Sequence, residues 1–313
     1  MDSSQLCEYE IEDELWFVDI EHGFRYIEIN NARAHATIST YSGQVLSYRP
    51  KSQQADLLFV SDTAYYENGK AIKGGIPVCW PWFGPDPENQ GRPAHGFVRN
   101  RQWGVTASES LADGSTRVVL SLADNDETRE IWSHPFRLDI EITVGDALTV
   151  ALVTHNTGDK SVTISQALHS YFQVGDISKV EVLGLDGTDY LDKIDDSTRK
   201  TQSGPVTIDG EVDRIYTGVT GELLIDDESL DRKIHITSRG CSTAVIWNPW
   251  ADTAASMGDL GDDDYRKMIC VETANAGPET VDIAAGGEYR LEAEYTIEGY
   301  RHSRESGNDG VNR

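Results

Sequence analysis

The stretch from Ala71 to Trp103 is rich in proline, glycine and aromatic residues and differs from the rest of the chain. It runs AIKGGIPVCWPWFGP over residues 71–85 and, after a polar segment, AHGFVRNRQW over residues 94–103. Its prolines are Pro77, Pro81, Pro85, Pro87 and Pro93. Neither a helix interior nor a central strand tolerates proline at this density, because proline fixes φ and lacks a backbone N–H. The sequence therefore predicts irregular chain held against a scaffold.

The side chains of this stretch indicate either a binding loop or a structural plug. Lys73 precedes Gly74 and Gly75, and we expect this glycine pair to let the backbone approach a ligand closely. His95 and Arg99 follow in the second half, while tryptophans beside prolines form a stiff aromatic wall. Irregular chain with cationic and aromatic side chains commonly binds ligands. The sequence is equally compatible with a structural plug that closes one end of a β-structure.

Short alternating runs on both sides of this stretch predict antiparallel strands. Apolar, β-branched and aromatic residues recur in period two, and turn residues such as Gly43 and Pro50 separate the runs. The expected strands are 25–29, 36–41, 44–48, 56–60, 116–122, 136–144, 147–154, 161–173, 179–185, 222–225, 233–238, 243–247, 267–272 and 289–297. The runs 136–144 and 147–154 should form a hairpin across Gly145 and Asp146. No window of ten or more residues shows helical periodicity with caps.

This strand content predicts an all-β fold. It exceeds a small immunoglobulin-like sandwich, so we expect an extended two-sheet sandwich with loops clustered along one face. All-β chains of about this length commonly form one unit, and we expect a single domain over residues 1–300. The polar segment 301–313 should be a disordered tail.

The charge limits the possible partners. The chain has 27 Lys and Arg against 53 Asp and Glu, a formal charge of −26 at pH 7. Nucleic acids and anionic membranes require a basic face, so we expect neither as a partner, and an anionic small ligand needs a local basic pocket. The start MDSSQ lacks a basic region and an apolar run, and no segment has membrane-spanning length. We expect a cytoplasmic monomer.

Cysteine spacing and standard motifs exclude several kinds of site. Cys7, Cys79, Cys241 and Cys270 lie far apart, so we expect four free thiols, with Cys79 and Cys270 buried near the site at most. The acidic segment 259–264 lacks calcium-loop spacing, and we expect no metal and no cofactor. The absence of G-x-S-x-G, P-loop and G-x-G-x-x-G motifs leaves serine-nucleophile chemistry and nucleotide binding unsupported.

Two titratable residues have unusual surroundings. His169 lies in QALHSYF, residues 166–172, where an imidazole on a strand could act as general acid or base. A core histidine bonded to a backbone carbonyl is the somewhat favoured alternative. Glu272 follows the apolar run MICV, where burial would desolvate its carboxylate and raise its pKa. Asp213 is less distinctive, and an ion pair with Arg214 explains it equally well.

Six blocks in order resemble the aldose 1-epimerase superfamily, and within it the glucose-6-phosphate 1-epimerase branch. They are KGGIP with WPWFG (73–77, 80–84), HGFVR (95–99), ALHSYF (167–172), VDRIY (212–216), WNP (247–249) and VETA (271–274). Each block alone is weak evidence, but their order between Gly23 and Ile297 is specific. The family usually has Arg at the position of Lys73, and Lys keeps the charge but loses the bidentate fork for phosphate. Some relatives have Gln where this chain has Ala94.

The resemblance implies a galactose-mutarotase-like β-supersandwich of two large antiparallel sheets. It implies an isomerase that interconverts the α and β anomers of a hexose 6-phosphate, foremost glucose 6-phosphate. The implied roles are catalytic acid for His169, catalytic base for Glu272, sugar-phosphate contacts for Lys73, Arg99 and Asp213, and a cleft-lining position for His95. A broad-specificity aldose 1-epimerase is the alternative within the family.

The reaction suits an imidazole and a carboxylate on chemical grounds too. One group removes the proton of the C1 hydroxyl while the other protonates the ring oxygen, so the ring opens, C1 rotates, and the ring closes on the other face. Each positioned proton transfer contributes ~10²–10⁴-fold. The roles reverse after closure, which suits two pKa values that lie close together near neutrality.

Two further classes stay open. A glycoside hydrolase needs a second opposed carboxylate, which the segment 259–264 could supply. A non-catalytic carbohydrate-binding protein would use Trp80, Trp82 and Trp247 as platforms, without needing His169 and Glu272 together.

Overall fold

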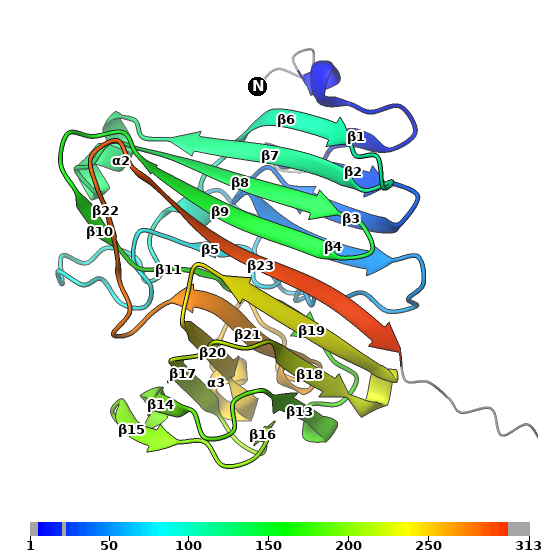
Figure 1. Ribbon diagram of the computed structural model, residues 1–313, viewed down its shortest axis with the longest axis vertical. Helices are drawn as coiled ribbons and strands as arrows, with labels where there is room; N and C mark the ends of the chain where they lie inside the picture. Colours follow the sequence, from blue (N-terminus) through cyan, green and yellow to red (C-terminus); the bar gives the residue numbers. More distant parts are fainter. Residues whose placement is uncertain (1–5, 21–22, 300–313) are drawn as a thin grey trace, which may run out of the picture.

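The computed structural model describes residues 6–20 and 23–299, and its largest layer is a nine-stranded antiparallel sheet (Figure 1). Its strands are β6 (Gly104–Ser110), β7 (Thr116–Ala123), β8 (Phe136–Val144), β9 (Leu148–Asn156), β13 (Val180–Leu183), β16 (Val206–Thr207), β18 (Leu223–Asp227), β19 (Arg232–Arg239) and β23 (Glu288–Gly299). They are ordered β16-β13-β18-β19-β23-β9-β8-β7-β6. The tail expected at 301–313 lies outside the described residues.

An eight-stranded sheet packs against one part of this layer. Its strands are β5 (Val78–Cys79), β11 (Gln166–Leu168), β12 (Tyr171–Gln173), β14 (Asp189–Asp192), β15 (Thr198–Thr201), β17 (Val212–Thr217), β20 (Thr243–Asn248) and β21 (Met268–Asn275). The order is β15-β14-β17-β20-β21-β11-β5, and β12 also pairs with β21. Phe172 on β12 meets Tyr295 on β23 edge to face, with 5.5 Å between ring centroids.

A four-stranded sheet lies behind β6–β9 in Figure 1. Its strands are β1 (Leu15–Asp19), β2 (Arg25–Asn30), β3 (Ala34–Ser39) and β4 (Gln44–Pro50), while β10 (Val162–Ile164) and β22 (Val281–Ile283) form a separate ribbon. The Tyr48 hydroxyl on β4 donates to the Gly145 carbonyl in the β8–β9 turn at 2.9 Å, which ties this sheet to the large one.

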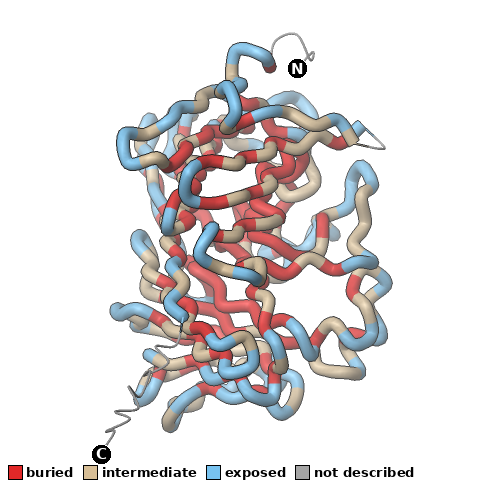
Figure 2. The backbone as a smooth tube through the Cα atoms, turned by 90° about the vertical axis from the view of Figure 1, so that its right-hand side faces the viewer, coloured by how far each residue is buried: buried red, intermediate tan, exposed pale blue. Residues whose placement is uncertain are grey.

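One hydrophobic core connects the three large sheets. Alternating side chains on β8 are buried, as the period-two pattern predicts. Ile38 on β3, Ile140 on β8 and Ile246 on β20 are all fully buried and belong to the same cluster. Figure 2 shows buried inner strands with exposed chain around the perimeter. The predicted all-β sandwich is confirmed.

Two expected strands are wrong, and both errors concern the site. Residues 56–60 form no strand; Leu58 and Val60 make single bridges to Phe172 and Gly74. The expected strand 161–173 divides into β10, β11 and β12. His169 therefore lies in the break between β11 and β12, and not on a strand. Its N–H donates at 2.9 Å to the Pro77 carbonyl of the proline-rich segment, while the following N–H, of Ser170, turns back to the Leu168 carbonyl at 3.0 Å.

The described chain also contains short helices that sequence periodicity missed. They are α2 (Asp126–Ile131), α3 (Trp250–Ser256) and 3₁₀ turns at Cys7–Tyr9, Val98–Asn100, Ile177–Lys179, Lys193–Asp195, Glu228–Leu230 and Asp264–Arg266. Six or seven residues complete fewer than two helical turns, too few for a period to emerge. Within the described ranges, no helix has the length and apolar character needed to cross a membrane.

Candidate active site

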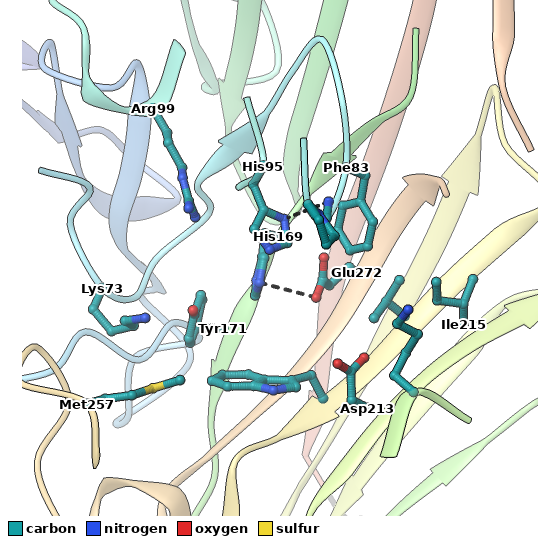
Figure 3. Close-up of a pocket in the computed structure, with 15 residues that line it drawn as sticks. Lys73, Phe83, His95, Arg99, His169, Tyr171, Asp213, Ile215, Met257 and Glu272 are labelled. Carbon is teal, nitrogen blue, oxygen red and sulfur yellow. Dashed lines mark hydrogen bonds and ion pairs between the residues drawn. The ribbon is translucent and has the colours of Figure 1, made fainter. Parts of the chain in front are cut away.

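A cavity of about 360 Å³ brings the six candidate residues together (Figure 3). They are Lys73, His95, Arg99, His169, Asp213 and Glu272. The cavity lies over the face of the eight-stranded sheet that points away from the main core. On neighbouring β20 and β21, Ile246 and Val271 face the main core, whereas Val245 and Glu272 face the cavity. Strand alternation therefore carries a carboxylate out of the core and into the cleft.

His169 and Glu272 face each other in this cavity. His169 Nε2 lies 3.4 Å from Glu272 Oε1, and the two residues expose only 8% and 2% of their surfaces. His169 Nδ1 and Glu272 Oε2 are buried without a hydrogen-bond partner among the described residues. Buried polar atoms normally have partners, so these two are free to bond a ligand.

Burial shifts the pKa values of the pair in opposite directions. Desolvation holds the pKa of His169 well below its ordinary value, and the positive charges of Arg99 and Lys73 lower it further. Desolvation raises the pKa of Glu272 well above its ordinary value; Asp213 adds to this and Arg99 opposes it. The 3.4 Å contact would be an ion pair only with a protonated imidazole. Desolvation is the first cause of both shifts, so burial favours the neutral form of each group.

His95 is a neutral donor beside the pair. Its Nδ1 accepts a long hydrogen bond of 3.5 Å from the Gly84 backbone N–H, which leaves the ring proton on Nε2. Burial, Arg99 and Lys73 lower the pKa of His95 to about 3. The ring meets Phe83 at 4.8 Å and His169 at 5.7 Å between centroids. This neutral ring can donate a hydrogen bond without competing for the catalytic proton.

Lys73 and Arg99 lie on one side of the pair in Figure 3, and Asp213 lies on the other. Arg99 belongs to the 3₁₀ turn Val98–Asn100, and its Nη2 donates to the Ala94 carbonyl at 3.1 Å. Asp213 lies on β17, where burial raises the pKa of its carboxyl. The cavity therefore has a cationic end and a carboxylate end.

The glycine pair after Lys73 approaches backbone and not a ligand, which corrects the expectation from sequence. A Cβ at Gly74 would lie 2.4 Å from the Phe59 carbonyl oxygen, and one at Gly75 would lie 2.2 Å from that of Val45. Neither glycine lines the cavity. The pair lets the Lys73 loop dock tightly against segments 45–46 and 59–60, and so fixes where the ammonium group emerges.

The aromatic wall is divided between core and cavity. Trp80 and Trp82 are buried in the main core, with Trp80 4.5 Å from Phe136 between ring centroids, so they are no platforms for a sugar. Phe83 and Trp247 do line the cavity. The proline-rich segment thus contributes side chains both to the core and to the cavity wall. The expected Asp213–Arg214 ion pair is not found among the described residues, where Arg214 lies over the Tyr190 ring at 4.9 Å.

Sequence reasoning missed several residues of the cavity wall, among them Tyr171 and Lys193. Tyr171 stacks on His169 with 4.9 Å between centroids and 11° between planes. Its position two residues after His169 was the available signal, because such residues share a face of extended chain. Lys193 comes from the turn Lys193–Asp195, and nothing in its surroundings in sequence indicates the cleft.

Comparisons with known proteins show the family of the chain. Residues 25–296 match the family model described as aldose 1-epimerase. A protein of Escherichia coli K12 named "Putative glucose-6-phosphate 1-epimerase" is 38% identical over 251 residues, covering 80% of this chain and 83% of the relative. A protein of the same name from Cenchrus ciliaris is 34% identical over 86% of this chain and 83% of its own length.

Solved structures give the same result at the level of fold. A crystal structure of "a putative mutarotase" from Salmonella typhimurium superposes with a TM-score of 0.87 at 30% identity, covering 93% of this chain and 96% of the other. A galactose mutarotase related enzyme from Lactobacillus acidophilus superposes with a TM-score of 0.69 at 13% identity, covering 88% and 97%. The second likeness concerns the fold alone and agrees with the expected galactose-mutarotase-like sandwich.

Proposed function

The chain belongs to the aldose 1-epimerase family, and from that premise we propose that it interconverts the α and β anomers of hexose 6-phosphates, with glucose 6-phosphate preferred. The observation that carries this proposal is the His169–Glu272 pair, 3.4 Å apart and buried in a cleft that also holds Lys73 and Arg99 on one side and Lys193 in its wall. A carbohydrate-binding protein needs no such pair, whereas acid–base ring opening does.

In the proposed reaction, Glu272 takes the proton of the C1 hydroxyl and His169 protonates the ring oxygen. The unpartnered Glu272 Oε2 suits the first step. The required imidazolium and carboxylate contain the same number of protons as a neutral imidazole beside a protonated carboxyl, the forms that burial favours, so the active form needs only a proton shift between the two residues. After C1 rotates, the reverse transfers close the ring on the other face.

Lys73 and Arg99 form the proposed phosphate site, and their charges also act on the acid. Both cations lower the pKa of His169 in the empty cleft. A phosphate bound between them would neutralise part of that field and so raise the pKa of His169, favouring the imidazolium that the reaction uses. Asp213 and His95 then contact hydroxyl groups of the sugar.

A coupled mutarotation assay with glucose, glucose 6-phosphate and galactose 6-phosphate tests the proposal. We expect catalysed anomerisation, with the highest kcat/KM on glucose 6-phosphate. Preference for the unphosphorylated sugar would favour a broad-specificity aldose 1-epimerase. Sugar binding with anomerisation at the uncatalysed rate would favour a carbohydrate-binding protein.

The proposal treats the enzyme as one folding unit that acts as a cytoplasmic monomer. The shared hydrophobic core of the three large sheets supports a single unit. A single unfolding transition and a solution mass near 34.7 kDa are the expected results.

A further inference from the structure

The cleft continues beyond its cations into a second depression of about 270 Å³. Lys73, Arg99 and Tyr171 line both spaces, so the two cations stand at the boundary. The depression is also lined by Lys70 and Asp259, and Asp259 lies beside Lys73. A carboxylate therefore lies next to the place that the proposed function gives to the phosphate.

The two boundary cations differ in their partners. Lys73 Nζ lies 3.5 Å from Asp259 Oδ2, and the two side chains expose 19% and 22% of their surfaces. Arg99 forms no ion pair with any carboxylate in the described part of the chain and donates instead to the Ala94 carbonyl. A carboxylate of the chain itself thus pairs with one of these two cations.

The segment that carries Asp259 is anchored across the cleft mouth. Asp264 Oδ2 accepts hydrogen bonds from the Ser61 hydroxyl at 2.6 Å and from the Gly261 N–H at 2.8 Å. A Cβ at Gly258 would lie 2.3 Å from the Tyr65 hydroxyl, so the two loops are in tight contact there. These contacts on either side of Asp259 keep its carboxylate near Lys73 when a ligand arrives.

We propose that Asp259 is a specificity-determining residue, which competes with the phosphate of the substrate for Lys73 and so limits the affinity for the anion. The proposal rests on the proposed function in placing the phosphate between Lys73 and Arg99. A phosphate monoester carries about −1.5 to −2 charges at pH 7, so a fixed carboxylate beside it repels it. The repulsion outweighs the benefit of an ordered lysine, because a partly exposed ion pair contributes little.

This arrangement has a definite consequence for specificity. A neutral hexose has no phosphate to bind Lys73, whereas the phosphate of a hexose phosphate must share this cation with Asp259. The carboxylate therefore narrows the difference in affinity between phosphorylated and free sugars.

The test compares Asp259→Asn with Asp262→Asn. Asp262 is exposed on the same segment, so its substitution changes the net charge equally without touching Lys73. Calorimetry with inorganic phosphate measures the Kd, and mutarotation of glucose 6-phosphate and glucose measures KM and kcat. For Asp259→Asn we expect about tenfold lower Kd for phosphate and KM for glucose 6-phosphate, the scale of one like-charge repulsion at a partly exposed site. The change on glucose should be much smaller, and Asp262→Asn should match the native chain.

Three results would overturn the proposal. Unchanged phosphate binding in Asp259→Asn would mean that the carboxylate does not compete, and weaker binding would mean that it orders Lys73. Equal tightening in both variants would reduce the effect to net charge. A failure of the proposed function would be visible separately, because mutarotation in the presence of the native chain would then proceed at the uncatalysed rate. Calorimetry with phosphate would still decide the role of Asp259.

Discussion

His169 and Glu272 lie against buried strands of the eight-stranded sheet, whereas Lys73 and Arg99 reach the same cleft from loops and stay partly exposed. Glu272 belongs to β21, all eight residues of which are buried. The cationic end depends on glycine-mediated docking of a loop and on a single 3₁₀ turn.

This difference separates two kinds of electrostatics within one cavity. Around the pair, loss of water is the main cause of both pKa shifts, and salt has little access to screen the charges. At the cationic end, charges meet water and ions, so each contact contributes less and depends on ionic strength. Substitutions at the two ends should therefore differ in size, in the kinetic constant they change, and in their response to salt.

The largest expected effect comes from removing the proton-transfer groups. His169→Asn and Glu272→Gln should each lower kcat by about 10²–10⁴-fold with little change in KM, because both groups act chiefly in the transition state. His155→Asn is a matched control, since His155 lies on β9 and pairs with Asp139 at 2.8 Å, away from the cleft. Initial rates over a range of glucose 6-phosphate concentrations separate kcat from KM. Loss of binding without loss of kcat would contradict the proton-transfer roles.

The next effect concerns the cationic end. Arg99→Ala should lower kcat/KM on glucose 6-phosphate by a factor that corresponds to about 1.5–3 kcal/mol of lost transition-state stabilisation, the value of a charge-assisted hydrogen bond. The loss of kcat/KM on glucose should be much smaller. Raising the ionic strength should shrink this difference, because the site is open to salt. Arg101→Ala is the control, since Arg101 pairs with Glu127 at 2.6 Å and does not line the cavity. Equal impairment on both sugars would remove Arg99 from the phosphate site.

Local sequence patterns predicted the buried end of the cleft better than the open end. The apolar run before Glu272 indicated a buried carboxylate, and strand alternation is what turns its side chain to the cleft. The break at His169 was not predictable from its neighbours, because it depends on hydrogen bonds of the folded chain: the Ser170 N–H turns back to the Leu168 carbonyl, and the His169 N–H donates to the Pro77 carbonyl, which is remote in sequence. Residues 56–60 likewise have a strand pattern but meet only single bridges.

Contacts between remote loops explain the other errors. Lys73 and Asp259 are brought together only by the folded sandwich, and neither local segment records the contact. Trp80 and Trp82 resemble sugar platforms by type and by proline neighbours, yet they pack into the core beneath the loop that carries the site residues. Residue type and local period identify what a strand buries, but they do not identify which loops meet above it.

The smallest expected effect is a gain in stability from Glu272→Gln. The folded-state pKa of Glu272 is raised above the unfolded value by burial. Between those two pKa values the folded state binds more protons, so the free energy of unfolding falls as pH rises through this range. Glutamine carries no charge and avoids this penalty.

The stability of Glu272→Gln should thus match that of the native chain near pH 4 and exceed it at pH 7–8. His169, whose pKa is shifted downward, contributes the opposite dependence in both proteins, because its stability is lost as pH falls below 6.5, so it cancels in the comparison. The gain should be about 0.5–2 kcal/mol, the usual size for relieving a functional site. Thermal unfolding of both proteins at several pH values measures it. A variant that is less stable than the native chain at pH 8 would show that neighbouring groups already stabilise the charged Glu272 carboxylate. The desolvation penalty at the buried end would then be smaller than its unpartnered oxygen implies.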